Sequence, residues 1–130
     1  MNPEIAAYFN GIEQRLLESH VVSGYTVVRR EITPTSGKVR LRVRLTDGGL
    51  LELFEYVVWE TKSGIIKRKY SYHWQGADGA VVRRWDAVAH HPELPYAPHH
   101  VHWPNGCVEG VAKPPSVEDV LTQIEGALDK

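Results

Sequence analysis

One alternating stretch decides the fold: Lys38-Val39-Arg40-Leu41-Arg42-Val43-Arg44-Leu45-Thr46. Successive side chains of an extended strand point to opposite faces of the sheet. The apolar side chains of this stretch therefore share one face, and the basic side chains share the other. We expect the apolar face of the resulting sheet to be buried and the arginine face to be open.

Segments with the same two-residue period surround this stretch. They predict strands over residues 25–32, 38–46, 50–60, 65–75 and 80–86. The short turns between them are rich in glycine, proline, aspartate and small polar residues; examples are Asp47-Gly48-Gly49 and Asp78-Gly79. Strands that follow one another through short turns favour an antiparallel meander.

Both ends of the chain predict amphipathic helices. Asn2-Pro3-Glu4 is typical of a helix start, and the apolar residues that follow at helical spacing are Ile5, Tyr8, Phe9, Ile12 and Leu16. Ser116 and Asp119 form a capping-box pattern before a second apolar stripe of Val117, Val120, Leu121, Ile124 and Leu128. The predicted fold class is α+β: an antiparallel meander sheet of about five strands flanked by an N-terminal and a C-terminal helix, with a long His/Pro-rich segment after the sheet. We expect both helices to cover one face of this sheet.

Side-chain matching predicts the register of two hairpins. A three-residue loop at 47–49 would place Leu45 opposite Leu51, Val43 opposite Leu53 and Arg44 opposite Glu52. A two-residue turn at Asp78-Gly79 would place His73 opposite Arg84 and Tyr72 opposite Trp85, whereas a three-residue turn would bring Arg83 opposite His73. Glu55 falls on the apolar face, where a carboxylate needs a partner, and we expect a neighbouring arginine or tyrosine to provide it.

Length and composition indicate one globular domain spanning 1–130. The chain is 42% hydrophobic and 24% charged, which is ordinary for a soluble protein, and its formal net charge of −1 argues against bulk attraction to nucleic acid. The single cysteine, Cys107, cannot form an internal disulfide, which fits a reducing compartment. Residues 1–10 show no signal-peptide pattern, and no apolar run is long enough for a membrane helix. We therefore expect a cytoplasmic protein with no membrane association.

Histidines gather in one part of the chain. Six of the seven lie between His73 and His102, and the segment 88–115, which also contains six prolines, holds five of them: His90, His91, His99, His100 and His102. Histidine titrates near neutral pH, and neutral imidazole is the commonest metal ligand. The cluster therefore indicates either proton-transfer catalysis or metal binding.

The catalytic interpretation is metal-independent cleavage of RNA. That reaction needs a base, an acid and a cation that stabilises the transition state. The candidate catalytic residues are His73, Arg84, His91, His99 and His100. Arg40, Arg42 and Arg44 are candidate phosphate contacts, and Tyr72 and Trp85 are candidate stacking partners for bases, although aromatics that alternate along a strand are more often part of a core.

The alternative interpretation is a metal-binding or non-enzymatic module that binds a protein partner. In an extended segment, His100-Val101-His102 would point two imidazoles the same way. His90, His91 or Glu93 could add a third ligand, and the set His90, His100 and His102 would suit zinc or another transition metal. The first interpretation requires no cofactor.

The chain also resembles a known family. The strings that carry the resemblance are Tyr70-Ser71-Tyr72-His73-Trp74-Gln75, Arg84-Trp85-Asp86-Ala87, His90-His91-Pro92 and Pro98-His99-His100-Val101-His102. They are similar to those of the TumE family of small prokaryotic toxins, and the resemblance extends over nearly the whole chain. It implies the toxin half of a toxin–antitoxin pair, a cognate antitoxin as partner, and a target in translation or RNA.

Overall fold

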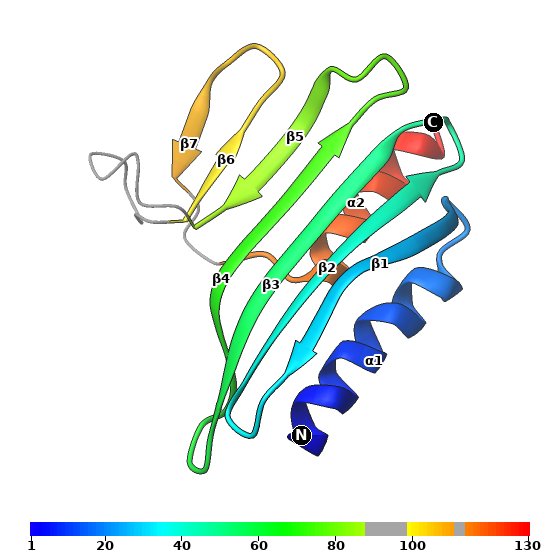
Figure 1. Ribbon diagram of the computed structural model, residues 1–130. Coiled ribbons are helices and arrows are strands. Elements are labelled where there is room, and N and C mark those ends of the chain that lie inside the picture. Colours follow the sequence, from blue (N-terminus) through cyan, green and yellow to red (C-terminus); the bar gives the residue numbers. More distant parts are fainter. Residues whose placement is uncertain (88–98, 111–113) are drawn as a thin grey trace.

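The computed structural model describes residues 1–87, 99–110 and 114–130. Its elements in chain order are α1 (Pro3–Glu18), β1 (Val22–Ile32), β2 (Ser36–Leu45), β3 (Leu50–Glu60), β4 (Gly64–Gln75), β5 (Val81–Asp86), β6 (His100–His102), β7 (Val108–Gly110) and α2 (Val117–Leu128). The strands form one antiparallel sheet in which each strand pairs with its neighbours in sequence (Figure 1). The predicted α+β meander with a helix at each end is confirmed.

The number of strands differs from the expectation of about five. Over the described ranges the sheet has seven strands, because the His/Pro-rich segment contributes β6 and β7, each three residues long. A tight turn joins them, in which the Trp103 N–H donates to the Cys107 carbonyl and Gly106 has a positive φ of 87°. Prolines discouraged a strand prediction here, but His100–His102 lies between Pro98 and Pro104 and contains none, so all its backbone groups can pair.

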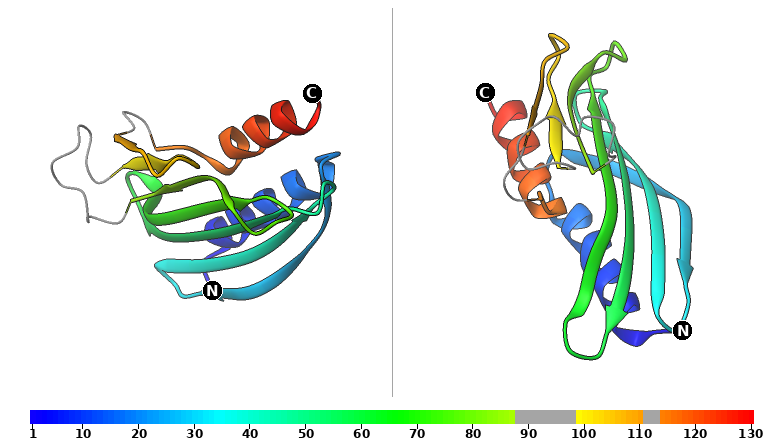
Figure 2. Two further views of the ribbon diagram at one scale, coloured as in Figure 1. Left: turned by 90° about the horizontal axis from the view of Figure 1, so that it is seen from above. Right: turned by 90° about the vertical axis from the view of Figure 1, so that its left-hand side faces the viewer.

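Both helices cover the same face of the sheet, as expected (Figure 2). The Asn2 side chain caps α1 by accepting hydrogen bonds from the backbone of Glu4 and Ile5. The core between helices and sheet is built from the apolar stripes of both helices and the inward side chains of β2 to β6: Ile5, Phe9, Ile12, Leu16, Val39, Leu41, Val43, Leu45, Leu51, Leu53, Val57, Tyr70, Tyr72, Trp74, Trp85, Val101, Val117, Val120, Leu121 and Ile124. No helix of the described residues lies over the opposite face (Figure 2).

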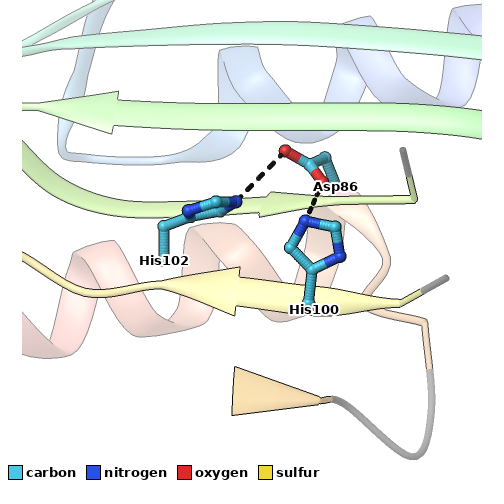
Figure 3. A group of neighbouring side chains, drawn as sticks. All are labelled: Asp86, His100 and His102. Carbon is cyan, nitrogen blue, oxygen red and sulfur yellow. Dashed lines mark ion pairs between the residues drawn. The ribbon is translucent and has the colours of Figure 1, made fainter. Parts of the chain in front are cut away.

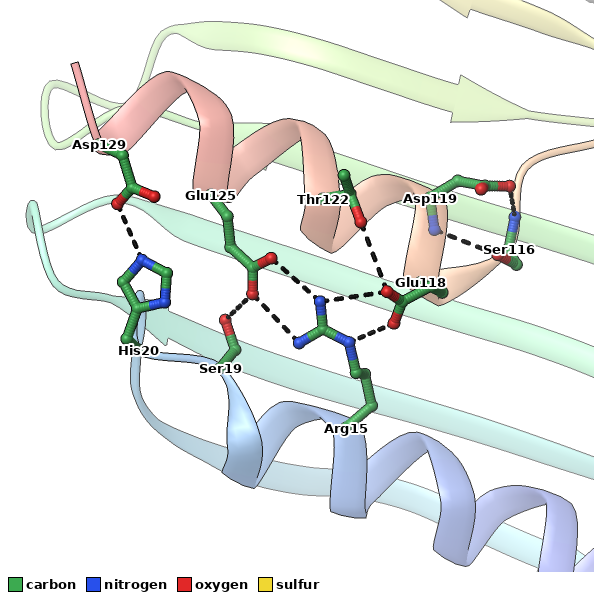
Figure 4. Close-up of polar contacts among 9 residues, drawn as sticks. All are labelled: Arg15, Ser19, His20, Ser116, Glu118, Asp119, Thr122, Glu125 and Asp129. Atoms are coloured by element: carbon green, nitrogen blue, oxygen red, sulfur yellow. Dashed lines mark hydrogen bonds and ion pairs between the residues drawn. The ribbon is translucent and has the colours of Figure 1, made fainter.

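Polar contacts hold the two helices together at their exposed edge (Figure 4). Arg15 of α1 forms ion pairs with Glu118 and Glu125 of α2, and the Ser19 hydroxyl donates to Glu125 at 2.6 Å. The predicted capping box of α2 is present: the Ser116 hydroxyl accepts from the Asp119 N–H, and the Asp119 carboxylate accepts from the Ser116 N–H. These contacts fix the position of α2 relative to α1.

The register between β2 and β3 differs from the prediction by two residues. Val43 lies opposite Leu51 and Arg42 opposite Glu52, because the three-residue loop is 46–48 and Leu45 donates its N–H to the Gly49 carbonyl. The positive φ of Gly48, 87°, ends this loop one residue earlier than expected. A shift of two preserves the face of every side chain, so the predicted apolar and arginine faces are unchanged.

The register between β4 and β5 is as predicted at the site, although the turn is not. His73 lies opposite Arg84 and Tyr72 opposite Trp85. The turn has three residues, 77–79, since Gly76 donates to the Ala80 carbonyl. A one-residue irregularity between Trp74 and Gln75 compensates for the longer turn.

Glu55 has the kind of partner expected for a buried carboxylate. Its side chain is completely buried and accepts hydrogen bonds from the hydroxyls of Tyr8 and Tyr72, the latter at 2.6 Å. The Lys67 ammonium lies 4.0 Å away and donates to the Tyr72 hydroxyl and to the Pro115 carbonyl. Burial, and then the Glu55 carboxylate, raises the pKa of both tyrosines, so both phenols remain neutral donors.

Candidate functional site

Polar side chains, interrupted by one phenylalanine, cross the open face of the sheet in two adjacent rows. The first row runs over β2 to β6 through directly opposed residues: Arg42, Glu52, His73, Arg84 and His102. The second row lies two residues further along each strand: Arg40, Phe54, Ser71, Asp86 and His100. Because a two-residue step keeps a side chain on the same face, both rows point away from the helices. Residues that are up to 62 positions apart in sequence, Arg40 and His102, therefore contribute to one surface.

A hollow of about 660 Å³ opens between these rows. Its lining includes the cations Arg40, Lys69 and Arg84, one carboxylate, Glu52, and the imidazole of His73. Phe54, Tyr70, Ser71 and Ala87 complete the wall. Three cations against one carboxylate give the hollow a positive lining that suits an anionic ligand.

His73 is the titratable group best placed in this hollow. Burial lowers its pKa from the ordinary histidine value, the Arg84 guanidinium lowers it further, and the Glu52 carboxylate opposes both. The imidazole is therefore neutral at pH 7 and able to accept a proton. Its buried Nε2 atom has no hydrogen-bond partner within the described part of the chain.

The three predicted phosphate contacts differ in their surroundings. Arg40 lies 4.8 Å from the centroid of the Phe54 ring and 3.7 Å from Glu52, and it lines the hollow. Arg42 is the most exposed partner of Glu52, to which its Nε donates at 3.0 Å. Arg44 donates to the Thr26 hydroxyl, at the β1 side of the sheet and away from the hollow. Glu52 thus orients two of the three arginines on the open face.

Asp86 joins the two histidines of β6 (Figure 3). Its Oδ1 lies 2.5 Å from Nε2 of His100, and its Oδ2 lies 3.6 Å from Nε2 of His102. The Arg84 guanidinium contributes a further ion pair, with its Nε 3.1 Å from Asp86 Oδ2. Asp86 is completely buried and His100 is 2% exposed, although both belong to the open face of the sheet.

The other predicted histidines do not join His73 within the described residues. His99 stacks on Tyr70, with ring centroids 5.8 Å apart, and its Nδ1 lies 3.0 Å from the Tyr70 hydroxyl. Tyr70 belongs to the core, so His99 lies toward the helix-covered side of the sheet. Burial lowers the pKa of His99, as do the nearby Lys67 and His100. His90 and His91 lie outside the described residues, and with them the predicted metal set His90, His100 and His102.

Tyr72 and Trp85 are not placed to stack on bases. Both belong to the core, where Tyr72 is completely buried and Trp85 is 4% exposed. Their alternation with polar residues places them on the buried face of the sheet. They are core residues, the role that aromatics alternating along a strand more often have. The aromatic residues that do line the hollow are Phe54 and Tyr70.

Sequence reasoning missed Asp86, Glu52 and Lys69 as site residues. The signal for Asp86 was present, because it lies two residues after Arg84 and so shares its face. Its pairing with His100 required β6, which was not predicted. Glu52 was treated as a partner of the arginine row, and its position opposite His73 depends on the register between β3 and β4.

Fold and site together define a class: an α+β protein with a meander sheet whose open face gathers imidazole, guanidinium and carboxylate groups around a cation-lined hollow. A family model described as Toxin TumE matches residues 12–129. The chain belongs to this toxin family, and the resemblance drawn from its histidine and tryptophan strings is confirmed. No curated protein and no solved structure matches the chain. Among the described residues, neither helix has the length and apolar character needed to cross a membrane.

Proposed function

We propose that this protein is the toxin of a toxin–antitoxin pair and that it cleaves RNA on the open sheet face without a metal ion. The observation that carries the proposal is the hollow, where a neutral imidazole, His73, lies among three cationic side chains. RNA offers the matching groups, a 2′-hydroxyl that can lose a proton and a phosphodiester that carries negative charge.

His73 would act as the general base. Its neutral imidazole takes the proton from the 2′-hydroxyl, the 2′-oxygen attacks phosphorus, and the bond from phosphorus to the 5′-oxygen breaks. The products are a 2′,3′-cyclic phosphate and a 5′-hydroxyl. Arg84, directly opposite His73, would stabilise the charge that develops on the phosphate oxygens in the transition state.

The 5′-oxygen needs a proton as it leaves. His91 is the candidate acid, because His99 contacts Tyr70 and His100 is buried against Asp86. This role for His91 remains a prediction from the sequence, since the residue lies outside the described part of the chain.

Arg40 and Lys69 would hold the neighbouring phosphates, because both line the hollow. Arg42 would extend this contact along the strand, held in place by Glu52. The net charge of the chain is only −1, so attraction to RNA depends on this local arrangement and not on overall charge.

Incubation of the purified protein with total RNA, with and without EDTA, tests the proposal. We expect cleavage that survives the chelator, yields cyclic phosphate ends and is lost in His73→Gln. His20→Gln is a matched control, because His20 is an exposed histidine paired with Asp129 and remote from the hollow. Absence of cleavage by the unaltered protein, or equal cleavage by His73→Gln, would refute the assignment.

Arg42 gives a second test through salt dependence. Replacing it with alanine should weaken RNA binding more at low salt than at high salt, because its contact would be mainly electrostatic. Lys62→Ala, in the turn between β3 and β4, is the control. An unchanged salt slope in Arg42→Ala would remove this arginine from the RNA surface.

The family also implies a cognate antitoxin. We expect expression of the chain to arrest bacterial growth and co-expression of its antitoxin to restore growth. His73→Gln should abolish the arrest without preventing the two proteins from co-purifying. Arrest by His73→Gln at equal protein levels would separate toxicity from this site.

A further inference from the structure

We propose that Asp86, His100 and His102 form a binding site for one divalent transition-metal ion of the zinc class, which joins β6 to β5. The proposal goes beyond RNA cleavage and does not depend on it. It also differs from the ligand set expected from sequence, since Asp86 replaces His90.

The three side chains already converge. Each offers one ligand atom, and these atoms all lie within 4.8 Å of one another. A tetrahedral ion about 2.0–2.1 Å from each nitrogen or oxygen ligand requires the ligand atoms to be roughly 3.4 Å apart. The separations of 2.5 Å from Asp86 Oδ1 to His100 Nε2 and 3.6 Å from Asp86 Oδ2 to His102 Nε2 lie on either side of that spacing.

The sheet itself creates this convergence. Asp86 lies directly opposite His100, and His102 lies one two-residue step further along β6, opposite Arg84. All three side chains therefore project from the same face (Figure 3). Two ligands come from β6 and one from β5, so an ion bound here would bridge the strands.

The donor types select the class of ion. Imidazole suits zinc, copper, nickel and iron, whereas calcium and magnesium prefer oxygen ligands alone. Three protein ligands leave a fourth position for water or another group.

Arg84 should modulate the affinity of this site. Its guanidinium lies 3.1 Å from Asp86 Oδ2 and competes for the carboxylate that the ion would use. Its side chain is 40% exposed, which leaves it room to turn toward the hollow. Arg84→Gln should therefore bind the ion more tightly than the unaltered protein.

An ion at this position would stabilise a short strand. β6 has only three residues paired to β5, Arg84 with His102, Trp85 with Val101 and Asp86 with His100. An ion that binds only the folded state raises the unfolding midpoint, by about 10 °C for a chain of this size when its concentration is a hundred times the dissociation constant.

The test is metal binding by the full chain. Protein stripped with chelator and dialysed against Zn²⁺ should bind one equivalent by elemental analysis, and Co²⁺ should give the intense visible absorption of a tetrahedral site. His102→Ala should lose both signals, and His102→Cys should retain them, because a thiolate is also a zinc-class ligand. His102 is partly exposed, so its replacement is the variant least disruptive to folding.

His20→Ala is the matched control. It should keep the full equivalent of Zn²⁺, because His20 follows the C-terminal end of α1 and pairs with Asp129. Circular dichroism of each variant separates loss of metal from loss of fold. Binding of no Zn²⁺ by the folded unaltered protein, or a full equivalent in folded His102→Ala, would overturn the proposal. Metal binding is measured in the absence of RNA, and RNA cleavage is measured on the metal-stripped protein. Either proposal can therefore fail without affecting the test of the other.

Discussion

Loss of the Glu55 side chain should strongly destabilise the protein. Its carboxylate is completely buried and accepts from the Tyr8 and Tyr72 hydroxyls, with the Lys67 ammonium 4.0 Å away. Hydrogen bonds to a charged group contribute about 1.5–3 kcal/mol each, and removing one partner of a buried pair costs about 3–5 kcal/mol. We therefore expect Glu55→Ala to lower the free energy of unfolding by about 3–5 kcal/mol, measured by urea denaturation.

Glu52 supplies a control on the same strand. It faces the open side, is partly exposed, and pairs with Arg40 and Arg42. Ion pairs of this kind contribute at most about 1 kcal/mol, so Glu52→Ala should lower the free energy of unfolding by no more than that. Equal losses in the two variants, or a loss below about 1 kcal/mol in Glu55→Ala, would show that the buried network does not stabilise the fold as argued.

Three further predictions concern the open face and the packing of α1. In an NMR titration, Arg84→Gln should raise the pKa of His73 because it removes a nearby positive charge, and Glu52→Gln should lower it; the opposite directions would contradict the electrostatics of the hollow. Since the folded-state pKa of His73 lies below its unfolded value, the free energy of unfolding should fall as pH falls from about 6.5 through the folded pKa, and His73→Gln should reduce that slope. Gly37→Ala should destabilise the protein by about 1–3 kcal/mol, because an added Cβ would lie 2.6 Å from Ile5 Cγ2 and 2.9 Å from Phe9 Cε2. Gly11→Ala lies in the middle of α1, and its added Cβ meets nothing within 4 Å beyond its neighbours and the backbone of its own helix. It should stabilise the protein by about 0.5–1 kcal/mol, and thermal unfolding of both variants checks the pair.

The sequence correctly predicted which face of the sheet a side chain occupies, because this depends only on whether its position along the strand is odd or even. The register of β2 on β3 was wrong by two residues, yet Val43 and Arg42 lie on the faces expected of them. His73 was correctly placed opposite Arg84 although the turn has an extra residue, since the irregularity after Trp74 absorbs it. A turn signal such as Asp-Gly marks where a hairpin reverses, but its loop length depends on backbone conformations that the letters alone do not determine.

The part of the site that could not be predicted depends on long-range pairing. His100-Val101-His102 has a strand period but only three residues, which is too short for a pattern to identify. Its pairing with β5 spans 13 to 17 intervening residues and brings Asp86 beside His100. The H-x-H spacing therefore indicated two imidazoles on one side, and only the fold could supply the carboxylate.

The division between faces also separates stability from function on a single strand. Tyr72 and His73 are consecutive in β4, yet Tyr72 donates to Glu55 beneath the helices and His73 lies in the cation-lined hollow. Tyr72→Phe would remove a buried hydrogen bond, at a cost of about 1–3 kcal/mol, and leave the hollow intact. His73→Gln would change proton acceptance in the hollow without touching the core. If RNA cleavage belongs to the open face, the first change should lower stability at constant cleavage rate and the second should abolish cleavage at nearly constant stability.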